Sequence, residues 1–141
     1  MFEMWKSIIT VICLGGLSVE DIRRKEIFGW SLLITAGIGL VLLAVDGCWR
    51  EWQTLYRFVP GLVCLLLGWL TRESIGYGDG LVLLCMGGFM GISQLVRMWF
   101  AAITMAGLVA IFLLVVRHMQ RKAELPFVPF LLMGYGVTFL N

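Results

Sequence analysis

The sequence predicts an all-α membrane protein with about six transmembrane helices. Of its 141 residues, 60% are hydrophobic and 14% are charged, and the mean hydropathy is +0.94. An ordinary soluble domain carries about 45–50% apolar and about 25% charged residues, so lipid must be the solvent for much of this chain. The apolar residues gather in six runs, which cover residues 7–19, 29–45, 58–71, 80–90, 95–116 and 127–140.

Most of these runs are shorter than the ~20 residues that a helix needs to cross about 30 Å of hydrocarbon. Several helices must therefore extend into flanking charged sequence. The fourth run covers only about 16 Å of helix, so its helix is expected to begin earlier, near Ser74. We expect the six spans to form a single domain over residues 1–141.

The basic residues predict the orientation of these spans. If the spans alternate in direction, seven Lys and Arg fall on one side and four on the other, which favours the first side as cytoplasmic and the amino terminus as external. The first side receives Arg23, Arg24, Lys25, Arg72, Arg117, Arg121 and Lys122, and the second receives Lys6, Arg50, Arg57 and Arg97.

Several function classes find no support in the composition. The net charge of +2 provides no basic footprint for nucleic acid. The four cysteines form no C-x-x-C pair, and His118 is the only histidine, so neither a metal nor another cofactor is expected. A cleaved signal peptide could account for residues 1–20, but no A-x-A-like site follows the apolar run, which favours a first span.

One charge is not explained as a loop residue. Asp79 lies directly against an apolar run in the sequence GYGDG, and a carboxylate inside a membrane helix costs several kcal/mol unless it faces a cavity or a partner. A functional site is therefore the default hypothesis, and the alternative is a helix-start aspartate favoured by the dipole. The glycines at 76, 78 and 80 remove side-chain bulk, so a second backbone or a peptide could approach the carboxylate closely.

A second aspartate is expected on the same side. Asp21 ends the first span; alone, it would be read as a solvated juxtamembrane charge. Together, Asp21 and Asp79 can form the carboxylate pair of aspartic proteolysis. One carboxylate, ionised, takes a proton from the attacking water, while the other, protonated, donates to the carbonyl oxygen.

Three stretches of the chain resemble the type IV prepilin peptidases, which are intramembrane aspartic proteases marked by G-x-G-D. DIRRKEI at 21–27 resembles the first-aspartate segment of the family, GYGD at 76–79 the second-aspartate motif, and ELPFVPFLLMG at 124–134 the Pro-containing start of the last helix. The resemblance implies a polytopic G-x-G-D protease bundle. By position it implies a catalytic pair of Asp21 and Asp79, with the site shaped by Gly76, Gly78, Pro126 and Pro129.

Family members remove a short, positively charged leader from pilin-like precursors at the cytoplasmic face of the membrane. The resemblance therefore implies a pilin-like precursor as the partner, a multi-pass protein of the cytoplasmic membrane, and both aspartates on its cytoplasmic side. The family usually has Pro and Asn after the isoleucine, where this chain has Phe28 and Gly29. No amino-terminal segment with C-x-x-C motifs is expected, as in the short relatives that serve Flp-type or archaeal-type pili; N-methylation and the oligomeric state stay open.

Two alternatives remain at this point. The presenilin and signal-peptide peptidases also use an aspartate followed by G-x-G-D, although PFVPF fits the prepilin group better. A non-enzymatic membrane subunit or small transporter could use Asp79 to relay protons or bind a cation, and would not require Asp21.

Overall fold

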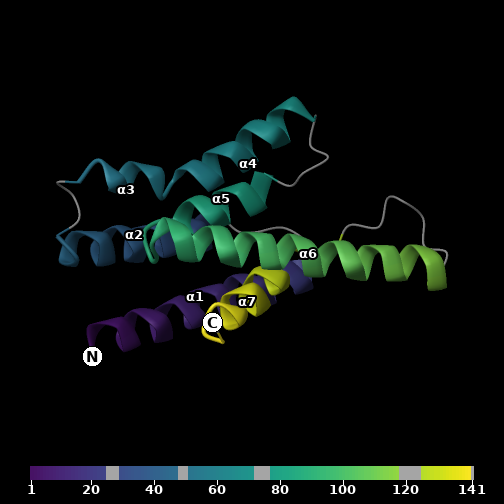
Figure 1. The fold of residues 1–141 in the computed structure, drawn as a ribbon, viewed down its shortest axis with the longest axis horizontal. Coiled ribbons are helices and arrows are strands. Elements are labelled where there is room, and N and C mark those ends of the chain that lie inside the picture. Colours follow the sequence, from purple (N-terminus) through teal and green to yellow (C-terminus); the bar gives the residue numbers. More distant parts are fainter. Residues whose placement is uncertain (25–28, 48–50, 72–76, 118–124, 141) are drawn as a thin grey trace.

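The computed structural model describes residues 1–24, 29–47, 51–71, 77–117 and 125–140, and this part of the chain contains helices and no strand. The all-α class is therefore confirmed. The helices, labelled in Figure 1, are α1 (Phe2–Arg24), α2 (Gly29–Val45), α3 (Gln53–Tyr56), α4 (Val59–Leu70), α5 (Tyr77–Met86), α6 (Ile92–Arg117) and α7 (Val128–Val137).

Each predicted apolar run forms one helix, and α3 is a single additional turn. The helix α1 extends beyond its run at both ends, because charged and polar residues continue the helix as far as Arg24. The helix α2 has the predicted bounds, and Gly47 follows it with a φ of 67°. That left-handed conformation is the one in which glycine commonly ends a helix.

The number of complete membrane spans stays a prediction. Among the described residues, two helical segments are long and apolar enough to cross a membrane, Phe2–Arg24 and Ile92–Val116. The apolar helices α2, α4, α5 and α7 have 17, 12, 10 and 10 residues. A 10-residue helix covers about 15 Å, roughly half of the hydrocarbon thickness. Two long and four short apolar helices fit a membrane environment.

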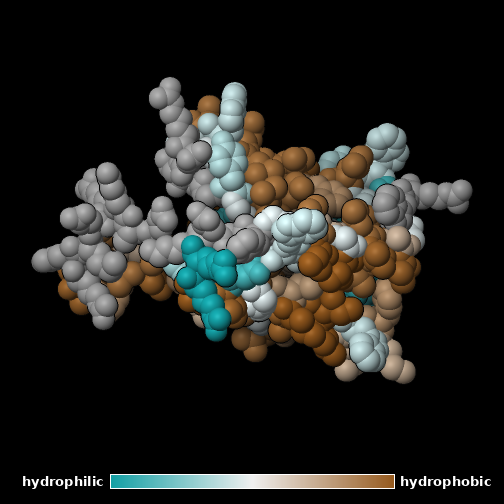
Figure 2. Space-filling view, turned by 180° about the vertical axis from the view of Figure 1, so that it is seen from behind, coloured by the Kyte–Doolittle hydropathy of each residue, from teal (hydrophilic) through white to brown (hydrophobic). Residues whose placement is uncertain are grey.

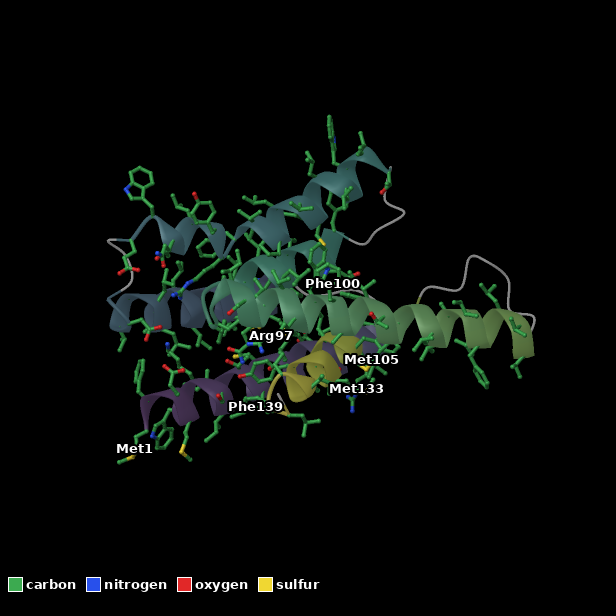
Figure 3. The ribbon with its side chains drawn as sticks, viewed as in Figure 1. Met1, Arg97, Phe100, Met105, Met133 and Phe139 are labelled. Atoms are coloured by element: carbon green, nitrogen blue, oxygen red, sulfur yellow. The ribbon has the colours of Figure 1, made fainter. Side chains whose placement is uncertain are left out.

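The helices lie side by side and alternate in direction along the chain (Figure 1). The helix α4 packs against α5, α6 against α7, α1 against α7, and α2 against α5. Figure 3 shows Met133 on α7 and Phe139 just after its end, and α7 runs beside the part of α6 that carries Arg97 and Met105. The end of α1 and the starts of α5 and α7 consequently lie at the same end of the bundle, on the right in Figure 1.

Glycines allow several of these helices to approach one another closely. A Cβ added at Gly61 of α4 would lie 2.6 Å from the backbone of Leu84 in α5. A Cβ added at Gly134 of α7 would lie 2.6 Å from the carbonyl oxygen of Met98 in α6. Small residues at helix interfaces are typical of membrane proteins, in which van der Waals packing replaces the hydrophobic effect as the cause of association between helices.

The outer surface is largely apolar. Figure 2 shows brown, hydrophobic side chains over much of one face of the molecule. Leu108, Phe112 and Val115 of α6 are each at least 60% exposed. Contiguous apolar surface of this kind is uncommon on soluble monomers, and it fits an environment of lipid.

Charged side chains meet at the end of the bundle opposite to the end of α1. The ammonium group of Lys6, near the start of α1, donates to a carboxylate oxygen of Asp46, just after α2. Both side chains are mostly buried, and Glu3 lies 3.9 Å from Lys6. This ion pair ties the start of α1 to the end of α2.

Candidate active site

Asp21 is the most deeply buried carboxylate in the described part of the chain, and it lies in the last turns of α1. The residue is 7% exposed. Its Oδ2 accepts a hydrogen bond from the backbone N–H of Val128, with 3.1 Å between the nitrogen and the oxygen. The contact joins residues that are 107 positions apart and fixes the orientation of the carboxylate.

The start of α7 explains why Asp21 finds a donor there. Val128 is the first residue of the helix, and its N–H has no partner within the helix. Phe127, at the N-cap position, offers no side-chain cap, so the carboxylate of Asp21 takes the place of one. Pro129 is tolerated at the second position because its missing N–H is not needed there.

The two prolines predicted to shape the site thus lie at the start of the helix that contacts Asp21. Pro126 and Pro129 flank the Phe127–Val128 pair, and both are partly buried. The predicted segment 124–134 is described from residue 125 onward. The resemblance to the family did not predict that this segment lies beside Asp21; the packing of the helices places it there.

Asp79 lies in the first turn of α5, where the helix dipole favours a negative charge. It is half-buried. The adjacent Gly80 packs on α4, because a Cβ at this position would lie 3.0 Å from the Leu65 side chain and 3.1 Å from its backbone nitrogen. The absence of a side chain at Gly80 therefore determines how deeply Asp79 sits between the helices.

The two predicted aspartates lie at the same end of the bundle. The negative charge of Asp21 acts on Asp79, although α1 and α5 are separated in sequence by three other helices. Gly78 precedes Asp79 in the first turn of α5. Gly76, and the expected helix start near Ser74, lie outside the described residues.

The sequence did not reveal two neighbours of Asp79. The charge of Asp79 acts on the thiol of Cys64, a buried residue of α4, and the side chain of Trp99 in α6 interacts with the same thiol. A cysteine and a tryptophan inside apolar runs carry no pattern that would single them out. They add α4 and α6 to the helices around the carboxylates.

Glu20 is a third carboxylate at this end of the bundle. Its Oε1 accepts a hydrogen bond from the hydroxyl of Ser31, with 2.7 Å between the oxygens. Ser31 lies in the first turn of α2. The other oxygen, Oε2, is buried and has no hydrogen-bond partner among the residues that the structure describes.

The donor set around the aspartates consists of carboxylates and a thiol, without a described histidine. In the ranges that the structure describes, no group of three or more His, Cys, Asp or Glu side chains could hold a metal ion. Carboxylates can exchange protons with water or with a substrate.

Fold and site together define a class of protein: an all-helical, largely apolar bundle with two carboxylates from separate helices at one end. The sequence profile of the type IV leader peptidase family matches residues 8–117, which is more than half of the chain. The chain therefore belongs to the type IV leader peptidase family, a family of peptidases, and the resemblance found in the sequence is confirmed. The matched range includes Asp21 and Asp79 and ends before the two prolines. No curated protein and no solved structure matches the chain.

Proposed function

We propose that the chain is an intramembrane aspartic endopeptidase that removes the basic leader from type IV pilin-like precursors at the cytoplasmic face of the membrane. One observation carries the proposal: in a member of the leader peptidase family, Asp21 and Asp79 converge at one end of the bundle and their charges interact. Two mutually repelling carboxylates share one proton more readily than they both ionise.

The reaction is a hydrolysis that needs no covalent intermediate. The ionised carboxylate accepts a proton from water as the water oxygen attacks the carbonyl carbon of the scissile amide. The protonated carboxylate donates to the carbonyl oxygen, and the proton returns to the leaving nitrogen as the C–N bond breaks. The titrating unit is the pair rather than either residue.

The chain's own backbone supports this arrangement. The Val128 N–H holds Asp21 Oδ2, and the backbone of Phe127 also interacts with this carboxylate, so the start of α7 orients it. Gly78, directly before Asp79, adds no side-chain bulk beside the carboxylate. An extended substrate peptide can therefore approach Asp79 with its backbone.

The same end of the bundle is the proposed cytoplasmic end. Arg23 and Arg24 are exposed at the end of α1, within one turn of Asp21, and basic residues of this kind favour the cytoplasmic side. The amino terminus would then lie outside, together with the Lys6–Asp46 pair. Membership of the type IV leader peptidase family favours a pilin-like substrate over a presenilin-like one.

Processing of a precursor in membranes tests the proposal. The chain is co-expressed with a pilin-like precursor from the same genome, and the wild type is compared with Asp21→Asn and Asp79→Asn. Asp46→Asn is the matched control, because it makes the same chemical change at the opposite end of the bundle. The wild type and the control should shorten the precursor, and each active-site variant should leave it intact at equal expression.

Two outcomes would contradict the proposal. Cleavage by both active-site variants would exclude the aspartic mechanism. Loss of function in Asp79→Asn alone, with Asp21→Asn unaffected, would instead support a proton- or cation-handling membrane protein.

A further inference from the structure

Glu20 differs from the other described glutamates in its surroundings. Glu3 and Glu51 are exposed, whereas Glu20 is held between α1 and α2 by the hydroxyl of Ser31. Glu20 directly precedes Asp21. Because successive residues of a helix point about 100° apart, Asp21 faces the start of α7 while Glu20 faces the start of α2.

Only one of the two oxygens of Glu20 is used by this contact. Its Oε2 is buried from water and accepts no hydrogen bond from the described part of the chain. A buried acceptor without a donor is costly, and such groups are rare in folded proteins. A glutamine at position 20 could accept the hydrogen bond from Ser31 equally well through its carbonyl oxygen. It would carry no second carboxylate oxygen that needs a donor. The bond to Ser31 therefore does not account for a carboxylate here.

We propose that Glu20 is a specificity residue that binds a positively charged side chain of the substrate's leader through its unpaired oxygen. An ammonium or guanidinium group supplies the missing donor and neutralises the charge, and charge-assisted hydrogen bonds of this kind are stronger than neutral ones. The inference rests on the proposed function. It adds a residue-level reason why a basic leader is preferred.

The position of Glu20 fits this role. It lies one residue before Asp21, so a bound cation sits beside the cleavage site and not at a distant surface. Ser31 holds Oε1 of Glu20 in place, so the Glu20 side chain loses less conformational entropy when the cation binds. Glu20 contacts the leader, and it takes no part in proton transfer.

A charge cycle between enzyme and substrate tests the inference. The wild type and Glu20→Gln are assayed in membranes with the native precursor and with a precursor whose leader Lys and Arg are replaced by Gln. Glu51→Gln is the matched control, because it removes an exposed carboxylate outside the proposed site. Thermal unfolding of each purified variant verifies that it is folded.

We expect Glu20→Gln to raise the KM for the native precursor about tenfold or more and to change kcat much less. With the neutral leader, the wild type and Glu20→Gln should have the same KM. A second variant, Glu20→Lys, should process a precursor with an acidic leader better than the wild type does. Glu51→Gln should behave as the wild type with every precursor.

The failures of the two proposals are distinguishable. If the wild type processes the native precursor and Glu20→Gln has an unchanged KM, the inference is wrong and the proposed peptidase stands. An equal loss for basic and neutral leaders would assign Glu20 a purely structural role. If the wild type processes no precursor, the proposed function fails, and the inference fails with it.

Discussion

Replacing Gly134 by alanine should destabilise the contact between the last two helices. The added Cβ would lie 2.6 Å from the Met98 carbonyl oxygen and 3.2 Å from the Ala102 nitrogen. Both obstacles are backbone atoms, which cannot move aside by changing a rotamer. To increase the distance to Met98 to an ordinary contact of 3.4 Å, α7 must shift by about 0.8 Å. Overpacking of this kind costs about 1–3 kcal/mol.

Gly136 provides the matched control within α7. A Cβ there meets nothing within 4 Å, so alanine should stabilise the helix by roughly 0.5–1 kcal/mol through its better helix propensity. Gly134→Ala gains the same propensity, so the two variants should differ by the overpacking cost of about 1–3 kcal/mol. For a chain of this size, this corresponds to a Tm difference of roughly 3–10 °C, measured on protein purified in one detergent.

Activity gives a second readout of the same displacement. Because α7 carries the Val128 N–H that holds Asp21, the shift caused by Gly134→Ala should also lower kcat for precursor processing. Equal Tm values for Gly134→Ala and Gly136→Ala would refute the reasoning, since they would mean that α6 and α7 do not pack as closely as described.

Three further changes have expected outcomes. Asp21→Ala should lower the free energy of unfolding by about 1–3 kcal/mol because it leaves the buried Val128 N–H unpaired, whereas Asp21→Asn keeps an acceptor; chemical unfolding of both variants compares them. Lys6→Gln should cost about 1–3 kcal/mol by removing the mostly buried partner of Asp46, with precursor processing at the opposite end retained. Leu131→Ala should cost about 2–5 kcal/mol, because this side chain is fully buried, and an unchanged Tm would contradict that burial.

The positions of the helices were largely predictable because each follows a local pattern. An apolar run bounded by charged residues or glycines becomes a helix with nearly the same bounds, as in α2 and α4. The exception is the run at 80–90, whose helix ends at Met86. Gly87 and Gly88 continue as a turn, closely packed against Arg57 and Gly39, and an apolar pattern does not reveal such contacts.

The two candidate aspartates stand out in the sequence, but their contacts do not. Asp79 is conspicuous in sequence because a charge beside an apolar run is costly, and Asp21 gained significance from its expected side of the membrane. Their convergence depends on how α1, α2, α5 and α7 pack, which is a long-range property of the chain. For the same reason, neither the bond from Val128 to Asp21 nor the bond from Ser31 to Glu20 could be inferred.

The hydrogen bond between Asp21 and Val128 has a consequence for biogenesis. Asp21 is in α1, and its backbone donor is in α7, which is synthesised about a hundred residues later. A partly inserted chain can contain both aspartates and still lack the contact that orients one of them. The proposed peptidase should therefore acquire activity only when α7 has been inserted, and nascent chains that lack α7 should be unable to cut neighbouring membrane proteins.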